Sequence, residues 1–389
     1  MFKAVVGHSN DPDSQEAVLE VLKQMHCALA GASPKAGILF AAIDFDHALI
    51  LREIIKAFPE IALIGGTTDG EISSVLGFEQ DSLTLIAFCS DSITISAGIG
   101  QEVSKGEQAA AQAAVQQAIA AHPEEIQLCI SLPESLTTSG VTIIESLKEA
   151  LGKQVPIFGG LTADQWRSQQ TYQFFQAEVH SDAVPVLLFS GPILFSHGVA
   201  SGWQPIGTAG RVTKAKRNVV YEIDDQPALS FYQRYLGALP PSSEYPLALS
   251  DSNSDLQYMR APSGIYDRST GSITFFGDVP TQSMVQITEA THDSILLASQ
   301  QSTQQALETY PGQMPAAALF FSCASRRQIL GSRTKEEFDQ AQRYLTQSSP
   351  VQALPSCGFY ANGEISPLQH KGETYLHNET FITLLLGEA

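Results

Sequence analysis

Apolar strand-like runs and amphipathic helix-like stretches alternate along this chain in an order that recurs three times. Each recurrence begins with an apolar run, passes through a helix-like segment, and reaches a second apolar run that ends in glycine. A polar loop and a third apolar run follow. Strands that alternate with helices predict an α/β or α+β fold. The three predicted strand–helix–strand–loop–strand units are residues 36–90, 124–190 and 315–387.

The polar loops are the most alike parts of the three units. They read ALIGGTTDGEI at 62–72, PIFGGLTAD at 156–164 and LPSCGFYANGEI at 354–365. A glycine ends each strand (Gly65, Gly159, Gly358), where it lets a ligand or another backbone approach closely. Gly-Glu-Ile-Ser stands at 70–73 and again at 363–366. Together these features predict an internally duplicated fold.

Further elements extend the recurrence. Helical stretches are predicted at 14–30, 105–121 and 291–309, one before each unit. A period of this length favours a duplicated fold over a solenoid, whose repeats span about 20 to 50 residues. The connections Ser90-Asp91-Ser92 and Ser190-Gly191-Pro192 are expected to close hairpins, so the sheets should mix parallel and antiparallel strands.

The chain is long enough for two domains. Its 389 residues exceed the size at which one hydrophobic core keeps growing. Residues 201–282 differ in texture from the units, with short β-like runs between prolines, glycines and serines, and one helix after Pro227. We therefore expect an N-terminal domain, 1–200, with two units. The C-terminal domain, 201–389, should hold this β-rich insertion and the third unit.

Composition narrows the class of protein. A net charge of −19 argues against binding to nucleic acid or to an anionic membrane surface. The basic cluster of Arg211, Lys214, Lys216 and Arg217 is interpreted as a solvated hairpin. Five cysteines without a CxxC pair predict a reducing compartment, and no apolar run is long enough for membrane insertion. We expect a soluble, cytoplasmic protein.

Enzymatic signatures are scarce. The chain has no GxGxxG after a strand, no GxxxxGK followed by Ser or Thr, no GxSxG and no HExxH. The spacing of His370 and His377 fits no standard zinc site, so neither a metal nor a cofactor is expected. Asp69 and Glu71 are paired acids, but such acids in a loop are more often hydrogen-bond acceptors than a catalytic dyad.

The recurring loops have a physical rationale as a binding surface, because ligands of open α/β sheets collect at the carboxyl ends of strands. Their hydroxyl, amide and carboxylate groups could orient a small polar ligand. Alternatively, threonine and aspartate at strand ends cap the next helix or close a turn. The candidate ligand-binding side chains are Thr67, Thr68, Asp69 and Glu71 in the first loop, Thr162 and Asp164 in the second, and Tyr360, Asn362 and Glu364 in the third.

The third unit adds Cys323 and Arg326 directly after its first predicted strand. Arg326 could clamp a ligand carboxylate in a bidentate geometry, or it could be solvated like its neighbour Arg327. Cys323 beside two arginines could have a lowered pKa and act as a nucleophile. Because no histidine lies in the same loop, a packing role for Cys323 is the alternative.

Five segments, which together span essentially the whole chain, resemble the FIST family, a sensory module with an N-terminal and a C-terminal FIST domain. They are GGTTDGEIS (65–73), FGGLTAD (158–164), FFSCASR (320–326), CGFYANGEISP (357–367) and LHNETF (376–381). The first segment has Gly66-Thr67 where the family pattern has Cys-Ser, so no role of a cysteine transfers there. The resemblance points to Cys323, Arg326, Gly358, Phe359, Tyr360, Gly363, Glu364, Asn378 and Thr380.

The resemblance implies a cytoplasmic, ligand-sensing protein of signal transduction, with small molecules such as amino acids as ligands. An acidic side chain would receive the ammonium group of an amino acid and an arginine its carboxylate. Because no kinase or cyclase segment is recognised, the output is expected to pass to a partner such as a histidine kinase or a chemotaxis-type component.

Two other classes of function remain open. One is a cysteine-dependent hydrolase or transferase that uses Cys323 with an acid or base from a neighbouring loop, which would show covalent labelling and turnover. The other is a scaffolding role. A sensor would show only saturable ligand binding, and a non-enzymatic sensor is the function that the sequence predicts.

Overall fold

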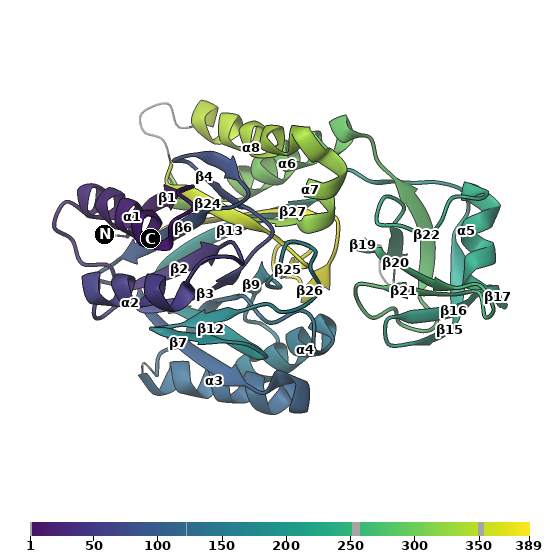
Figure 1. Ribbon diagram of the computed structural model, residues 1–389, viewed down its shortest axis with the longest axis horizontal. Helices are drawn as coiled ribbons and strands as arrows, with labels where there is room; N and C mark the ends of the chain where they lie inside the picture. The colour runs from purple at the N-terminus through teal and green to yellow at the C-terminus, as the bar shows by residue number, and fades with distance from the viewer. Residues whose placement is uncertain (1, 122, 251–256, 349–353) are drawn as a thin grey trace.

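The computed structural model describes residues 2–121, 123–250, 257–348 and 354–389. Three six-stranded sheets form the larger part, called the body below, and a nine-stranded sheet forms a smaller inserted domain beside it (Figure 1). The sheets of the body contain both parallel and antiparallel pairs. The predicted α/β class with mixed sheets is therefore confirmed.

From here on each unit includes the strand and helix that precede it, so that unit one comprises residues 3–89. Its first helix begins where the Asp13 side chain accepts hydrogen bonds from the backbone N–H groups of Gln15 and Glu16. The apolar face of that helix is buried against the sheet. The elements are β1 (Lys3–Ser9), α1 (Ser14–Leu29), β2 (Ala36–Ala41), α2 (His47–Ala57), β3 (Ala62–Thr67), β4 (Glu71–Ser73), β5 (Gly77–Glu79) and β6 (Leu83–Cys89).

Unit two comprises residues 94–190. Its alanine-rich helix packs closely on a strand, because Cβ atoms at Gly98 and Gly100 would collide with the helix backbone at Ala114 and Ala110. The elements are β7 (Thr94–Gln101), η1 (Val103–Lys105), α3 (Glu107–Ala121), β8 (Ile126–Ser131), α4 (Gly140–Leu151), β9 (Ile157–Gly160), β10 (Gln173–Phe175), β11 (Glu178–His180) and β12 (Ala183–Ser190).

Unit three begins with one strand at residues 193–200 and resumes at residue 292, after the inserted domain. Because its first strand precedes residue 201 and pairs with its last strand, the sheet of this unit crosses the domain boundary expected at residue 200. That boundary stays a prediction. The elements are β13 (Ile193–Ala200), α6 (His292–Glu308), β23 (Ala317–Cys323), α7 (Ala324–Leu330), η2 (Gly331–Arg333), α8 (Thr334–Ser348), β24 (Ser356–Ala361), β25 (Glu364–Pro367), β26 (Thr374–His377) and β27 (Phe381–Glu388).

The three sheets of the body share one strand order. They run β1-β6-β2-β3-β10-β11, β7-β12-β8-β9-β25-β26 and β13-β27-β23-β24-β4-β5. The outer two strands of each sheet form a hairpin donated by another unit: β10 pairs with β3, β25 with β9, and β4 with β24. The units thus exchange hairpins in a closed ring. Their origin by duplication stays a hypothesis.

The expectation that a glycine ends each of these strands is wrong, because β3 continues to Thr67, β9 to Gly160 and β24 to Ala361. The three glycines nevertheless have the same role in all three units. Gly65, Gly159 and Gly358 each lie opposite a residue of the parallel neighbouring strand. A Cβ atom at any of them would collide with the carbonyl oxygen of that residue, which is Leu39, Ser131 or Phe320 respectively. The close approach predicted at these glycines is therefore made by another backbone.

The expected hairpins at 90–92 and 190–192 are wrong. β6 and β7 belong to different sheets, and so do β12 and β13. Each short connection carries the chain from one sheet to the next, while the antiparallel partners of β6 are β1 and β2. The inner faces of the sheets enclose a common core, in which Phe40 of unit one stacks on Phe359 of unit three with 4.9 Å between ring centroids. The helices lie outside this core (Figure 1).

The inserted domain has its own apolar core, which includes Val220, Phe231, Tyr232 and Phe275. A second apolar cluster, with Trp203 and Ile295, joins it to the body. Its elements are β14 (Gln204–Pro205), β15 (Gly210–Lys216), β16 (Val219–Ile223), β17 (Gln226–Pro227), α5 (Ala228–Leu236), β18 (Leu247–Ser250), β19 (Gln257–Arg260), β20 (Pro262–Asp267), β21 (Ser272–Phe275) and β22 (Met284–Glu289).

Candidate ligand-binding site

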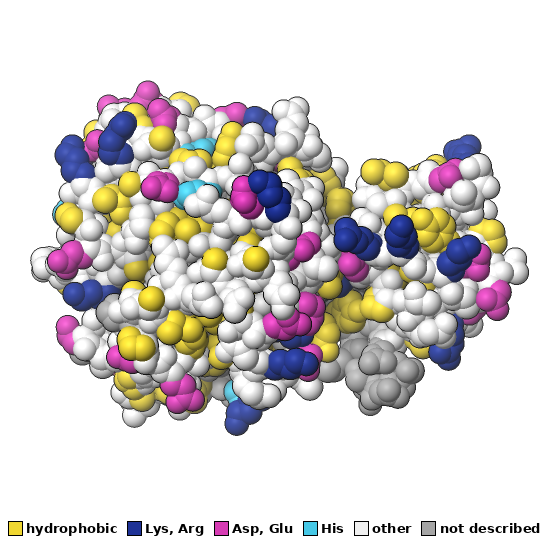
Figure 2. Space-filling view, turned by 90° about the horizontal axis from the view of Figure 1, so that it is seen from below, with side chains coloured by type: hydrophobic (Ala, Val, Ile, Leu, Met, Phe, Trp, Pro, Cys, Tyr) yellow, Lys and Arg dark blue, Asp and Glu magenta, His cyan; other side chains and the backbone are white. Residues whose placement is uncertain are grey.

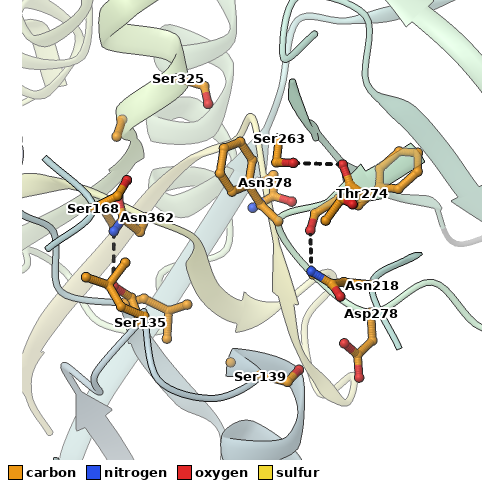
Figure 3. Close-up of a pocket in the computed structure, with 18 of the residues that line it drawn as sticks. Ser135, Ser139, Ser168, Asn218, Ser263, Thr274, Asp278, Ser325, Asn362 and Asn378 are labelled. Atoms are coloured by element: carbon orange, nitrogen blue, oxygen red, sulfur yellow. Dashed lines mark hydrogen bonds between the residues drawn. The ribbon is translucent and has the colours of Figure 1, made fainter. Parts of the chain in front are cut away.

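A cavity of about 410 Å³ lies where unit two, unit three and the inserted domain meet. Figure 3 shows hydroxyl, amide and carboxylate side chains from all three parts around one space. Pockets between domains are common places for small ligands, and this volume is within the usual range of about 300 to 1,000 Å³. We therefore treat this cavity as the candidate site.

Unit two contributes the segment that leads into α4. The helix starts at Gly140, where a Cβ atom would collide with Leu161 and Leu376. Ser139 stands at the N-cap position, yet its side chain makes no capping hydrogen bond, and its buried Oγ atom has no partner among the described residues. The start of α4 thus presents unpaired polar groups to the cavity.

Unit three contributes the ends of β23 and β24 and the residue after β26. Cys323, Ser325, Asn362 and Asn378 line the cavity. Asn362 donates from Nδ2 to Ser135 Oγ at 3.0 Å, while Asn378 Oδ1 accepts from the backbone N–H of Ala261 at 3.2 Å. Both amides keep hydrogen-bonding capacity beyond these contacts.

The inserted domain contributes two charged side chains. Arg217, in the turn between β15 and β16, and Asp278, between β21 and β22, both line the cavity. Among the described residues, neither side chain makes a hydrogen bond or a salt bridge, although Asp278 lies near enough to the buried Arg260 to raise the pKa of that guanidinium against the larger effect of burial. Arg217 lies near Glu107 at the start of α3 and contributes to lowering the pKa of that carboxyl, behind the larger effect of the Thr138 hydroxyl.

A loop of unit two completes the wall. The Asp164 carboxylate accepts hydrogen bonds from the backbone N–H groups of Ser168, Gln169 and Gln170, at 2.7–3.2 Å. This arrangement closes the loop around Trp166, whose indole ring meets Phe276 of the inserted domain edge to face. Asp164 therefore shapes the loop, as in the alternative that the sequence left open for strand-end aspartates.

Four of the candidate residues from the sequence line the cavity: Cys323, Asn362, Asn378 and Asp164. Thr162 does not line it: this side chain is buried and donates a hydrogen bond to the carbonyl oxygen of Pro133 at 3.0 Å. The other candidates lie elsewhere. Arg326, Tyr360, Glu364, Thr67, Thr68, Asp69 and Glu71 are all fully buried, and none of them lines the cavity.

Arg326 is an internal anchor. The residues after Cys323 form helix α7, not a loop, and this turns Arg326 towards α8, where its Nη2 lies 2.6 Å from Glu337 Oε1. Its remaining hydrogen bonds go to Glu337 and to three backbone carbonyls, which include that of Ser201 in the segment between β13 and β14. All five N–H donors are used, so in this structure none is free for a ligand carboxylate.

Acidic side chains gather behind Cys323. Tyr360 donates to Glu337 at 2.8 Å, and Glu364 accepts from the backbone N–H of Thr380 at 3.0 Å. Burial raises the pKa of Glu364 to about 8. Burial, with the charges of Glu364 and Glu379, also raises the pKa of the Cys323 thiol well above its ordinary value. This is the opposite of what the sequence suggested for a cysteine beside two arginines.

The first loop joins the three units to one another. Asp69 forms an ion pair with Arg327 of α7, with 2.8 Å between Oδ2 and Nε, and accepts from the indole N–H of Trp166 at 3.1 Å. Burial raises the pKa of Asp69 to about 6 against the opposing effect of Arg327. The Thr67 hydroxyl oxygen accepts a hydrogen bond from the backbone N–H of Tyr172.

The two Gly-Glu-Ile-Ser segments have matching hydrogen-bond chains. In unit one, His8 lies between Ser73 and Ser82 at 2.7 and 2.8 Å, and Ser82 donates to Glu71. Glu71 also accepts from Thr68. In unit three the corresponding chain is Ser366, His377, Thr380 and Glu364. These polar groups are buried and, apart from Glu364 Oε1, are hydrogen-bonded among the described residues, which favours a structural role.

Comparison with known protein families identifies the family of this chain. Residues 35–226 match the FIST N domain, and residues 228–367 match the FIST C domain. The chain belongs to the FIST family. FIST domains are sensory domains of signal transduction. In this FIST protein the cavity is lined by residues of the FIST N match and by residues of the FIST C match.

Two relatives extend the comparison. An uncharacterized protein of Methanocaldococcus jannaschii is 31% identical over 140 residues, which are 34% of this FIST protein and 27% of that relative. The match therefore spans about a quarter of the relative's length. A crystal structure of cyanuric acid hydrolase from A. caulinodans aligns over 100% of this chain and 99% of its own, with 10% identity and a TM-score of 0.36. A likeness this weak says nothing about activity.

Sequence reasoning missed several cavity residues of this FIST protein. Arg217 belongs to the cluster interpreted as a solvated hairpin, and Asp278, Trp166 and Ser139 stand in segments without a motif. The sequence signal that could have located Arg217 was its position, with Asn218, at a tight β-turn.

Within the described residues, no helix is long and apolar enough to cross a membrane, and no cluster of His, Cys, Asp and Glu is arranged to hold a metal ion.

Proposed function

We propose that this chain senses a small polar metabolite, such as an amino acid, in the cavity. The observation that carries this proposal is the presence of Arg217 and Asp278, two opposite charges that line the cavity without an ion-pair partner among the described residues. A zwitterion would supply a carboxylate for the guanidinium and an ammonium group for the carboxylate. Arg217 takes the role that the sequence suggested for Arg326, and Asp278 takes that of the acidic side chain expected to receive the ammonium group.

The site also suggests how occupancy reaches a partner. A ligand that contacts both the body and the inserted domain favours the arrangement in which both sets of contacts are made. A signalling protein, such as a histidine kinase or a chemotaxis-type component in the cytoplasm, would then recognise that arrangement. Membership of a sensory family supports this proposal.

The environment of Cys323 favours a sensor over a cysteine-dependent enzyme. A nucleophilic cysteine needs a lowered pKa. Burial and the nearby charges of Glu364 and Glu379 instead raise the pKa of Cys323, so its thiol stays protonated at neutral pH. Ligand binding in the cavity is then reversible and non-covalent.

The test is a thermal-shift screen of the purified chain against amino acids and other small polar metabolites, with calorimetric titration of each hit. A ligand present at a hundred times its Kd raises the free energy of unfolding by about 2.7 kcal/mol. Arg217→Gln and Asp278→Asn should each weaken binding about ten- to hundredfold.

The matched controls are Arg211→Gln and Asp225→Asn, which change the same charges at exposed positions of the inserted domain outside the cavity lining. These variants should bind like the parent. Undiminished binding by both Arg217→Gln and Asp278→Asn would place the ligand elsewhere and refute the proposed site.

A further inference from the structure

Exposed apolar side chains gather around the cavity. Ten large hydrophobic side chains are exposed among the described residues. Four of them, Leu136, Trp166, Ile265 and Phe276, line this one cavity. Figure 2 shows hydrophobic side chains in the recess between the body and the inserted domain. Such a concentration marks an interaction surface, because apolar groups kept in water gain free energy when a partner covers them.

The four side chains come from both sides of the cavity. Leu136 and Trp166 belong to unit two, whereas Ile265 and Phe276 belong to the inserted domain. Ile265 has the largest exposed fraction of the ten, 67%, so the described residues leave most of its surface uncovered. A ligand between the two sides would cover all four.

The aromatic wall is held in position. The Trp166 indole N–H donates to Asp69, which is itself held by Arg327. Phe276 meets the indole edge to face, with 6.0 Å between ring centroids. The two rings therefore offer a preformed apolar surface. Because their side chains are already ordered, less conformational entropy is lost when a ligand binds against them.

We propose that the ligand has an apolar body, a branched aliphatic chain or one aromatic ring, that is covered by these four side chains while its zwitterionic end meets Arg217 and Asp278. This inference rests on the proposed function and specifies the class of amino acid or related zwitterion. The polar lining alone would accept serine or asparagine equally well. The apolar rim favours leucine or phenylalanine.

The experiment compares five probes, glycine, L-serine, L-asparagine, L-leucine and L-phenylalanine, by calorimetric titration of the full chain. Burial of one apolar side chain should make leucine or phenylalanine bind about ten- to a hundredfold more tightly than glycine. Ile265→Ser and Phe276→Ala should each lower the ratio of the leucine affinity to the glycine affinity and so remove most of this preference. Leu239→Ser, at a position also exposed on the inserted domain but outside the cavity lining, is the control and should bind like the parent.

The outcomes separate this inference from the proposed function. Serine or asparagine binding as tightly as leucine would overturn the apolar preference and leave the proposed function standing. An unchanged preference in both Ile265→Ser and Phe276→Ala would also overturn it. Binding of none of the five probes would remove the proposed amino acid ligand and the inference with it.

Discussion

The indole ring of Trp166 and the ring of Phe276 meet edge to face across the boundary between the body and the inserted domain, with 6.0 Å between their centroids. Each ring is more than a third exposed, so the contact is made at the surface and not in a core. It is one of the points at which a ligand in the cavity would affect the position of the inserted domain.

A double-mutant cycle should measure this contact. Trp166→Ala and Phe276→Ala are expected to show a coupling of about 0.5–1.5 kcal/mol in the free energy of unfolding, the usual value for an aromatic pair. Urea denaturation of the parent, the two single variants and the double variant supplies the numbers. Trp166→Ala combined with Leu239→Ala should be additive, and a coupling near zero for the Phe276 pair would show that the rings do not stabilise each other.

Arg326→Ala is expected to destabilise the fold. It removes the guanidinium from a fully buried ion pair and leaves the Glu337 carboxylate uncompensated, a change that usually costs about 3–5 kcal/mol. Chemical denaturation of the variant measures this cost, and Arg211→Ala on an exposed strand position should change stability by less than about 0.5 kcal/mol. A fold of unaltered stability would show that Arg326 is not an internal anchor.

Stability should fall as the pH rises from 7 to 8. Burial raises the pKa of Glu71 to about 8 in the folded state, far above its unfolded value. In this range the folded chain therefore binds a proton that the unfolded chain has lost, so the free energy of unfolding decreases by up to about 1.4 kcal/mol per pH unit. Urea denaturation between pH 7 and 9 checks this.

Glu71→Gln should make that pH profile flatter, because the amide carries no ionisable proton. Glu364, whose pKa burial also raises to about 8, should leave a residual slope in the variant. Glu60→Gln, at an exposed position, should keep the parent's profile. Parallel profiles for Glu71→Gln and the parent would contradict a protonated Glu71 in the folded state.

Alanine should be poorly tolerated at the glycines of β3, β9 and β24 that lie opposite a parallel strand. A Cβ atom at Gly159 would collide with the carbonyl oxygen of Ser131, and overpacking of this kind typically costs about 1–3 kcal/mol. Gly106 has extended backbone, with φ at 174°, and open space around its Cβ position, so Gly106→Ala should lie within about 0.5 kcal/mol of the parent. Equal melting temperatures for the two variants would refute the close approach at Gly159.

Cysteine labelling tests the environment of Cys323. Iodoacetamide at neutral pH is expected to modify the exposed Cys27 and to leave Cys323 unmodified, because burial and two carboxyl groups keep the Cys323 thiol protonated. Mass spectrometry of the digested protein reports both sites at once. Faster labelling of Cys323 than of Cys27 would favour the cysteine-dependent enzyme.

Long regular elements were predictable from the sequence, whereas pairing between units was not. The helix expected at 14–30 is α1 at Ser14–Leu29, and the helix expected at 105–121 is α3 at Glu107–Ala121. Helix α7 was missed because seven residues are too few to show a period of 3.6. The exchange of hairpins depends on contacts between distant segments, which local pattern does not encode.

The same limit applied to the candidate site. Asn362 was found because it lies in a loop after a predicted strand, a position that does not depend on tertiary contacts, whereas Asn378 was found through the resemblance to the FIST family. Arg217 is exposed in the turn of the β15–β16 hairpin, as the solvated hairpin predicted. Its place beside the cavity was not predictable, because the surface opposite it comes from unit two. Arg326 was placed in a pocket because the sequence did not show that Glu337 of α8 would bind it.

The exchange of edge hairpins has a consequence for how the molecule comes apart. Removal of any one unit would take a hairpin from one neighbouring sheet and leave the hairpin of another unit without the sheet to which it adds. The body should therefore melt as one cooperative block, while the inserted domain, which has a separate core, can open at its own temperature. A structural change at one point of the body would therefore move the whole body, as a rigid piece, relative to the inserted domain.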